Sequence, residues 1–122
     1  MTREEKNRKL LEFVGFRVYH YGIGAWTGLN HIIQWEHPDG SIRNSAPDFF
    51  DPEHGIAWGF KWLYPELRRR GYDYELYGWQ QDEHKCIIVT RAGHWRHQVS
   101  KAIAKEPAVA LAEAVLKLLE VK

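Results

Sequence analysis

The chain has 122 residues, 44% of them hydrophobic, and its 17 Lys and Arg residues nearly balance 16 Asp and Glu residues. This length and composition suit one folded domain, 1–122, and the charge balance is not typical of a protein that binds a DNA or RNA backbone. One cysteine excludes an intrachain disulfide, and the charged start MTREEKNRKLL lacks the apolar stretch of a signal peptide. No apolar run is long enough to span a membrane, so we expect a cytoplasmic protein that does not bind membranes.

The first part of the chain predicts a helix and two strands. Residues 2–13 form the helix, because Thr2 can cap it and Gly15 suits its end. The strands are FRVYHY (16–21) and LNHIIQWE (29–36), which are rich in β-branched and aromatic residues.

A longer helix follows in the middle of the chain. Asp51 is a suitable N-cap, Pro52 fits the first helical position, and Gly71 suits the end after Arg70. Pro65 lies inside this helix, where a missing N–H predicts a kink or a split.

The last third of the chain predicts two more strands and a helix. The strands are YDYELYGW (72–79) and KCIIVTR (85–91). Residues 92–106 are interpreted as a long connection, and Pro107 opens a largely apolar final helix. The expected fold is therefore α/β (α+β), in the order αββαββα. Its sheet is mostly antiparallel, has about four strands and packs against the helices.

Several stretches, taken in order, resemble the phage ABA-sandwich domain family. They are EFVGFRVY, WEHPDG, PDFFDPEHGIAWGF and EPAVALAEAVLKLL, and together they extend over most of the chain. The resemblance implies a layered α/β fold and a phage origin, and it carries no catalytic motif. By analogy with small phage proteins of similar build, it also implies a sponge for the nucleotide signals of bacterial immunity.

The middle helix carries more aromatic residues than one core face requires. On a helical projection Ile56, Phe60, Leu63 and Leu67 form the expected core stripe, and Trp58 and Trp62 point the opposite way. Either another element of the domain covers this second face, or it forms a homo-oligomer interface, or it stacks a flat ligand.

The segment GHWRHQ (93–98) is the main candidate for a ligand site. It follows a central strand, Trp95 can stack on a base, and Arg96 can bind a phosphate. The alternative is a solvated loop whose tryptophan enters the core. The full set of candidate ligand-binding residues is His94, Trp95, Arg96, His97, Arg91, Trp26, Arg68 and Arg69.

Two members of this set also have simpler explanations. Arg68 and Arg69 suit the negative end of the middle helix without any ligand. Trp26 lies in a glycine-rich segment that fits a hairpin loop, and this loop can also close over a ligand.

Catalysis and metal binding have little support in the sequence. Cys86 lies in an apolar strand, where a thiol is usually inert. Asp48, Asp51 and His54 form a possible acid–base group, although capping explains the aspartates. No third metal ligand accompanies His94 and His97, so we expect no metal and no cofactor.

The expected function is that of a non-enzymatic phage anti-defence protein in the cytoplasm of the bacterial host. It would bind and sequester a small nucleotide-derived immune signal, either a cyclic nucleotide or a cyclised ADP-ribose, and act as a homo-oligomer. One alternative is a protein-binding adaptor or inhibitor that uses the Trp58/Trp62 face. The other is a small nucleotide hydrolase that uses His94 or His97.

Overall fold

Helix α1 (Arg3–Phe13) begins and ends at the residues that its capping pattern predicts. The Glu5 N–H donates to the Thr2 hydroxyl oxygen at 3.2 Å, and Gly15 adopts a φ of 100° after the last turn. A positive φ of this size costs other residues energy but not glycine. The computed structural model describes residues 2–23, 30–80, 83–92 and 95–120.

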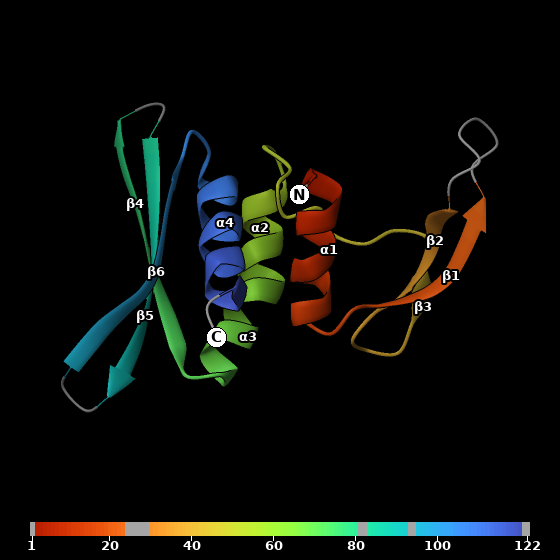
Figure 1. Cartoon of the computed structure of the whole chain (residues 1–122), viewed down its shortest axis with the longest axis horizontal. Helices are drawn as coiled ribbons and strands as arrows, with labels where there is room; N and C mark the ends of the chain where they lie inside the picture. The colour runs from red at the N-terminus through yellow and green to blue at the C-terminus, as the bar shows by residue number, and fades with distance from the viewer. Residues whose placement is uncertain (1, 24–29, 81–82, 93–94, 121–122) are drawn as a thin grey trace.

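The strands form two separate sheets. One contains β1 (Arg17–Ile23), β2 (Asn30–Glu36) and β3 (Ile42–Arg43), and the other contains β4 (Tyr72–Gln80), β5 (Glu83–Ala92) and β6 (Trp95–Ala104). Each is antiparallel and follows chain order, and we call them sheet A and sheet B. Figure 1 shows the helices between the two sheets. The α+β class is confirmed, but the prediction of one sheet with about four strands is wrong.

Strand β6 replaces the long connection predicted over residues 92–106. Its inward-facing residues are small: Ser100 lies opposite Ile88, and Ala102 lies opposite Cys86. A bulge opposite Ile88 and Val89 interrupts the pairing with β6 and shifts the alternation of inward-facing and outward-facing residues along β6. Small inward residues and a bulge remove the two-residue hydrophobic period by which a strand is recognised.

Helix α4 (Pro107–Glu120) is the central element of the core. It contacts β5 and β6 on one side and α1 and α2 on the other, and its buried residues are Ala108, Ala110, Leu111, Ala112, Ala114, Val115 and Leu116. Glu113 instead pairs with Lys6 of α1 at 2.7 Å. The predicted helix and its broad apolar surface are confirmed. Among the described residues, no helix is long and apolar enough to cross a membrane.

The middle helix begins later and buries a different stripe than predicted. It consists of α2 (Gly55–Trp58), the π-helical turn η1 (Gly59–Leu63) and α3 (Tyr64–Arg69). The buried residues along it are Gly55, Gly59, Leu63 and Leu67, whereas Phe60 is 47% exposed. The predicted core position of Phe60 is therefore wrong.

Two glycines explain this shift of the buried stripe. A Cβ at Gly55 would lie 2.5 Å from the Phe49 carbonyl oxygen and 2.9 Å from Ala108 Cβ. A Cβ at Gly59 would lie 2.6 Å from Leu111 Cδ2. Since only glycine leaves this space open, the helix backbone itself packs against α4.

Pro65 does not split the middle helix. The Tyr64 N–H donates to the Gly59 carbonyl, which closes a wide turn immediately before the proline. A π-helical turn holds more residues than the 3.6 of an α-helical turn. Buried residues at every fourth position of the middle helix therefore stay on the same side of that helix. The chain then ends α3 and turns at Gly71, whose φ is 88°, as predicted.

Candidate functional site

The predicted ligand segment belongs to the end of the β5–β6 hairpin. Trp95, Arg96 and His97 are residues of β6, not of a loop, and Arg96 and His97 are exposed. The backbone register places Arg96 opposite Arg91 and Trp95 opposite Ala92. His94 and Trp26 lie outside the described residues.

The guanidinium group of Arg96 is oriented by a carboxylate. It forms an ion pair with Glu75 of β4, and the Arg96 side chain is still 45% exposed. Glu75 also accepts a hydrogen bond from the Tyr77 hydroxyl. A guanidinium has five N–H donors, so one carboxylate leaves several of them available for an anion.

The arginines at the end of α3 are oriented in a similar way. Arg68 donates to the Tyr64 hydroxyl oxygen at 2.8 Å, and Arg69 donates through Nε to Glu66 at 3.0 Å. Arg70 Nε also donates to Glu66, at 2.8 Å. Hydrogen bonds from Arg69 and Arg70 lower the pKa of the Glu66 carboxyl. Glu66 is thus ionised at neutral pH and fixes two of the three arginines.

The fold brings these arginines to one end of sheet B. Gly71 connects α3 directly to β4, whose first residue Tyr72 pairs with Thr90, the neighbour of Arg91. The pKa of Arg68 is raised mainly by Tyr64 and, more weakly, by Asp73 of β4, so α3 and the sheet end interact. Figure 1 shows α3, the start of β4, the end of β5 and the start of β6 toward the lower side of the view.

We call this set the arginine end: Arg68, Arg69, Arg70, Arg91 and Arg96. The carboxylates Glu66 and Glu75 bind members of this set, and Asp73 lies close enough to Arg68 to affect its pKa. The backbone register places the predicted ligand residues Arg91 and Arg96 opposite each other, and Arg68 and Arg69 lie at the end of α3, shortly before β4 begins. Arg70 follows them in sequence, but its guanidinium lies 4.4 Å from the Phe13 ring of α1.

Trp58 and Trp62 are partly buried and pack against the hydrophobic core. The Trp62 ring meets Phe16 edge-on at 5.0 Å, and the Lys61 ammonium lies 5.7 Å from the Trp58 ring and 5.5 Å from the Trp62 ring. Within the described part of the chain, Trp62 Nε1 is buried and has no hydrogen-bond partner. Another element thus covers much of this face, and an oligomer contact through it stays a prediction.

A groove between α1 and sheet A was not predicted from the sequence. Its volume is about 640 Å³, and its floor includes Leu11, Ile32 and Trp35. At its rim, Arg8 donates to the Tyr21 hydroxyl oxygen at 2.7 Å. The lining residues come from four segments of sequence, and no local pattern connects them. The groove is lined by α1 and sheet A, and Figure 1 shows sheet A and sheet B on opposite sides of the helices.

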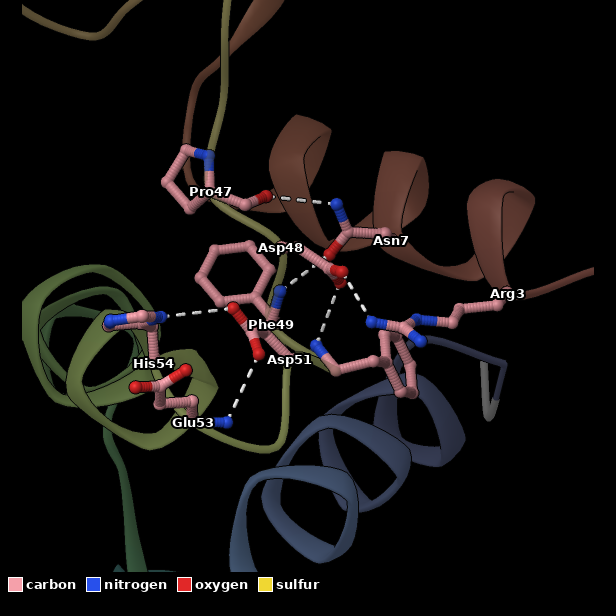
Figure 2. Close-up of polar contacts among 9 residues, drawn as sticks. Arg3, Asn7, Pro47, Asp48, Phe49, Asp51, Glu53 and His54 are labelled. Atoms are coloured by element: carbon pink, nitrogen blue, oxygen red, sulfur yellow. Dashed lines mark hydrogen bonds and ion pairs between the residues drawn. The ribbon is translucent and has the colours of Figure 1, made fainter.

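The possible acid–base group around His54 is a structural network. Figure 2 shows Asn7 of α1 bound to two backbone groups of the 47–54 segment: it donates to the Pro47 carbonyl and accepts from the Phe49 N–H, both at 2.9 Å. Asp48 pairs with Arg3, and it does not approach His54 in this view.

Asp51 closes the turn before α2 instead of capping the helix. Its carboxylate accepts from the Glu53 N–H at 3.0 Å, and it lies 3.2 Å from His54 Nδ1. These two contacts, the backbone one first, lower the pKa of Asp51. The aspartates thus stabilise turns and an ion pair, and the predicted N-cap role of Asp51 is wrong, because His54 occupies the N-cap position of α2.

The remaining chemistry-bearing groups of the described residues show no assembled site. Burial raises the pKa of the Cys86 thiol to about 12, which disfavours the nucleophilic thiolate. In the ranges that the structure describes, no group of three or more His, Cys, Asp and Glu residues is placed to hold a metal ion.

Comparisons with known proteins add no relative. No protein-family model matches the chain, and no curated protein or solved structure matches it either.

Proposed function

We propose that this chain is a non-enzymatic anti-defence protein of a phage, which sequesters a small nucleotide-derived signal in the host cytoplasm. The ligand is an anionic molecule that carries a flat ring, such as a cyclic nucleotide or a cyclised ADP-ribose. The arginine end is its binding surface, and the protein acts as a homo-oligomer. The phage origin and the anti-defence role rest on the family resemblance alone.

The observation that carries the ligand class is the pairing of Arg91 with Arg96 across two strands. Like charges at directly opposite positions destabilise an antiparallel pair, and a bound anion would offset that cost beyond what Glu75 contributes at Arg96. Glu75 holds Arg96 in place, and Glu66 and Tyr64 hold the α3 arginines. Donors that are already oriented lose less entropy when they bind a phosphate.

The base would stack at the hairpin end, where Trp95 begins β6. Stacking contributes about 1–3 kcal/mol per base. A charge-assisted hydrogen bond from Arg96 contributes about 1.5–3 kcal/mol. Loss of both therefore weakens binding by about two to four orders of magnitude, at roughly 1.4 kcal/mol per decade.

Calorimetry with cyclic dinucleotides, cyclic trinucleotides and cyclised ADP-ribose derivatives tests the proposal. We expect one of them to bind, and the double variant Trp95→Ala with Arg96→Ala to lose that affinity while its circular dichroism stays native. Arg17→Ala is a matched control, because Arg17 is also a strand arginine paired with a glutamate, Glu36, at 3.3 Å. The control should bind like the wild type.

The other outcomes assign the site elsewhere. Unchanged affinity in the double variant contradicts the hairpin site and points to Arg68 and Arg69, to the Trp26 segment or to the groove at Arg8. Arg8→Ala and Arg68→Ala then separate these sites. If no member of the panel binds, the adaptor function becomes the better proposal.

A further inference from the structure

Sheet B has one face covered by α4 and one face on which no described element packs (Figure 1). The backbone register gives the outward face three rows across β4, β5 and β6. These rows are Asp73–Val89–Gln98, Glu75–Ile87–Lys101 and Tyr77–Lys85–Ile103. The inward rows contain Tyr74, Ile88 and Ser100, and Leu76, Cys86 and Ala102, which pack in the core.

The outward face combines exposed apolar groups with charges. Ile103 is 51% exposed and Tyr77 is 39% exposed, and Ile87 lies between the two charged residues of the middle row. Val89 of the first row is only 4% exposed, so the exposed apolar surface of this face comes from the other two rows. Single exposed apolar residues are common, but here they occupy neighbouring positions of one sheet face.

The charges on this face are sorted by strand. The edge strand β4 carries the acidic residues Asp73 and Glu75, and the opposite edge strand β6 carries the basic residues Arg96 and Lys101. A face that is acidic along one edge and basic along the other is complementary to itself when one copy is turned over.

We infer that this face of sheet B is the contact between two copies of the chain. The two-fold axis runs between the facing sheets, parallel to the strands, so β4 of one copy faces β6 of the other. Glu75 then meets Lys101 of the second copy, Tyr77 meets Ile103, and Ile87 meets its own counterpart. Two twisted sheets pack in this way with their strands aligned to within about 30°.

The contacts already present within one copy are compatible with this arrangement. Glu75 binds Arg96 and Tyr77 in its own chain, and a carboxylate can accept a further bond from a lysine. Lys85 faces its counterpart, but its ammonium lies 5.5 Å from the Tyr77 ring of its own chain. Each lysine is therefore attracted sideways, away from the axis.

The same symmetry places both arginine ends at one end of the dimer, because an axis parallel to the strands preserves their direction. The inference does not depend on the ligand proposal. A monomer that binds nucleotides would contradict the dimer and the oligomeric part of the proposed function but not the ligand, and a dimer that binds none would contradict only the ligand.

Sedimentation equilibrium of the full chain tests the dimer. Ile103→Asp should weaken self-association by at least about 100-fold, because the dimer carries the change twice and each new carboxylate is buried against a tyrosine. Ile42→Asp is the matched control, since Ile42 is a 39% exposed strand isoleucine on sheet A. It should dimerise like the wild type.

Cross-linking gives a second measurement that does not depend on the Ile103 variant folding. Ile87→Cys should be joined into a dimer by a short bis-maleimide, because facing sheets lie about 10 Å apart. Ile42→Cys should not be joined, and Cys86 is fully buried and should not react.

Three results would overturn the inference. The first is a wild type that stays monomeric at the highest concentration. The second is an Ile103→Asp variant that dimerises like the wild type, which would place the contact elsewhere, for example at Trp58 and Trp62. The third is cross-linking of Ile42→Cys as efficient as that of Ile87→Cys.

Discussion

Replacing Gly55 by alanine tests whether the middle helix packs its backbone against α4. Helix propensity alone predicts that Gly55→Ala stabilises the protein by about 1 kcal/mol. The packing predicts the opposite, because the new Cβ would lie 2.5 Å from the Phe49 carbonyl oxygen and 2.9 Å from Ala108 Cβ.

The Phe49 backbone cannot move away easily to make room. Its N–H is bound by Asn7 at 2.9 Å, and its side chain is 1% exposed (Figure 2). Overpacking of this kind costs about 1–3 kcal/mol, and we expect the upper half of that range because both clashing atoms are fixed. When the gain in helix propensity is subtracted from this packing cost, Gly55→Ala should lower the free energy of unfolding by about 1–2 kcal/mol.

Urea denaturation followed by circular dichroism measures this change. Ala57→Gly is the matched control in the same helix, because Ala57 is exposed. This variant should lower the free energy of unfolding only by the difference in helix propensity, about 1 kcal/mol. A Gly55→Ala protein that is more stable than the wild type would refute the close approach of α2 to α4.

Four further predictions concern the remaining contacts. Asn7→Ala should lower the free energy of unfolding by about 1–3 kcal/mol, because it leaves the Phe49 N–H without its hydrogen-bond partner. Arg3→Ala, which removes the exposed ion pair with Asp48, should lower it by less than about 1 kcal/mol, and urea denaturation compares the two variants. Cys86 should resist alkylation at pH 8 in the native protein and react only in denaturant, because burial raises its pKa to about 12; mass spectrometry counts the adducts. The pKa of the Glu66 carboxyl in the folded protein lies below its usual 4.5, so its ion pairs with Arg69 and Arg70 stabilise the fold above pH 4.5, and this stability is lost as the pH falls through the folded pKa. Glu66→Gln should therefore show a smaller acid-induced decrease of the melting temperature. Dialysis against a strong chelator should leave the melting temperature unchanged, and a drop restored by zinc would contradict this.

The helices could be predicted because their determinants are local. Thr2 caps α1, Pro107 opens α4 and Gly71 ends α3, and each of these residues acts within one turn of its own position. The strands β1, β2, β4 and β5 were also expected, since their β-branched and aromatic residues are contiguous.

The division into two sheets could not be predicted in the same way. Strand β6 buries Ser100 and Ala102, and small inward residues leave no hydrophobic alternation to recognise. Strand β3 has two residues, too few for any periodicity. The buried stripe of the middle helix was misjudged because Gly55 and Gly59 are buried without adding hydrophobicity.

The candidate site was predicted in part. The sequence indicated Arg91, at the end of a strand, and Arg96, in the segment after it, as candidate ligand residues, and the strand register shows them opposite each other. The proximity of Arg68 and Arg69 to the same sheet end follows from the α3–β4 connection, which a helix boundary at Gly71 predicts. The groove beside α1 depends on the placement of sheet A and has no counterpart in any one stretch of sequence.

Sequestration of an unmodified anionic ligand is the central claim, and mass spectrometry of the released molecule tests it most directly. The full chain is incubated with lysate from bacteria whose nucleotide-based immunity has been activated, re-purified and denatured by heat. We predict the release of a phosphate-bearing, ultraviolet-absorbing molecule, chemically unchanged and in a fixed ratio to the protein, and its absence from the Trp95→Ala, Arg96→Ala double variant. Release of no such molecule, or of a hydrolysed product in its place, would contradict the account.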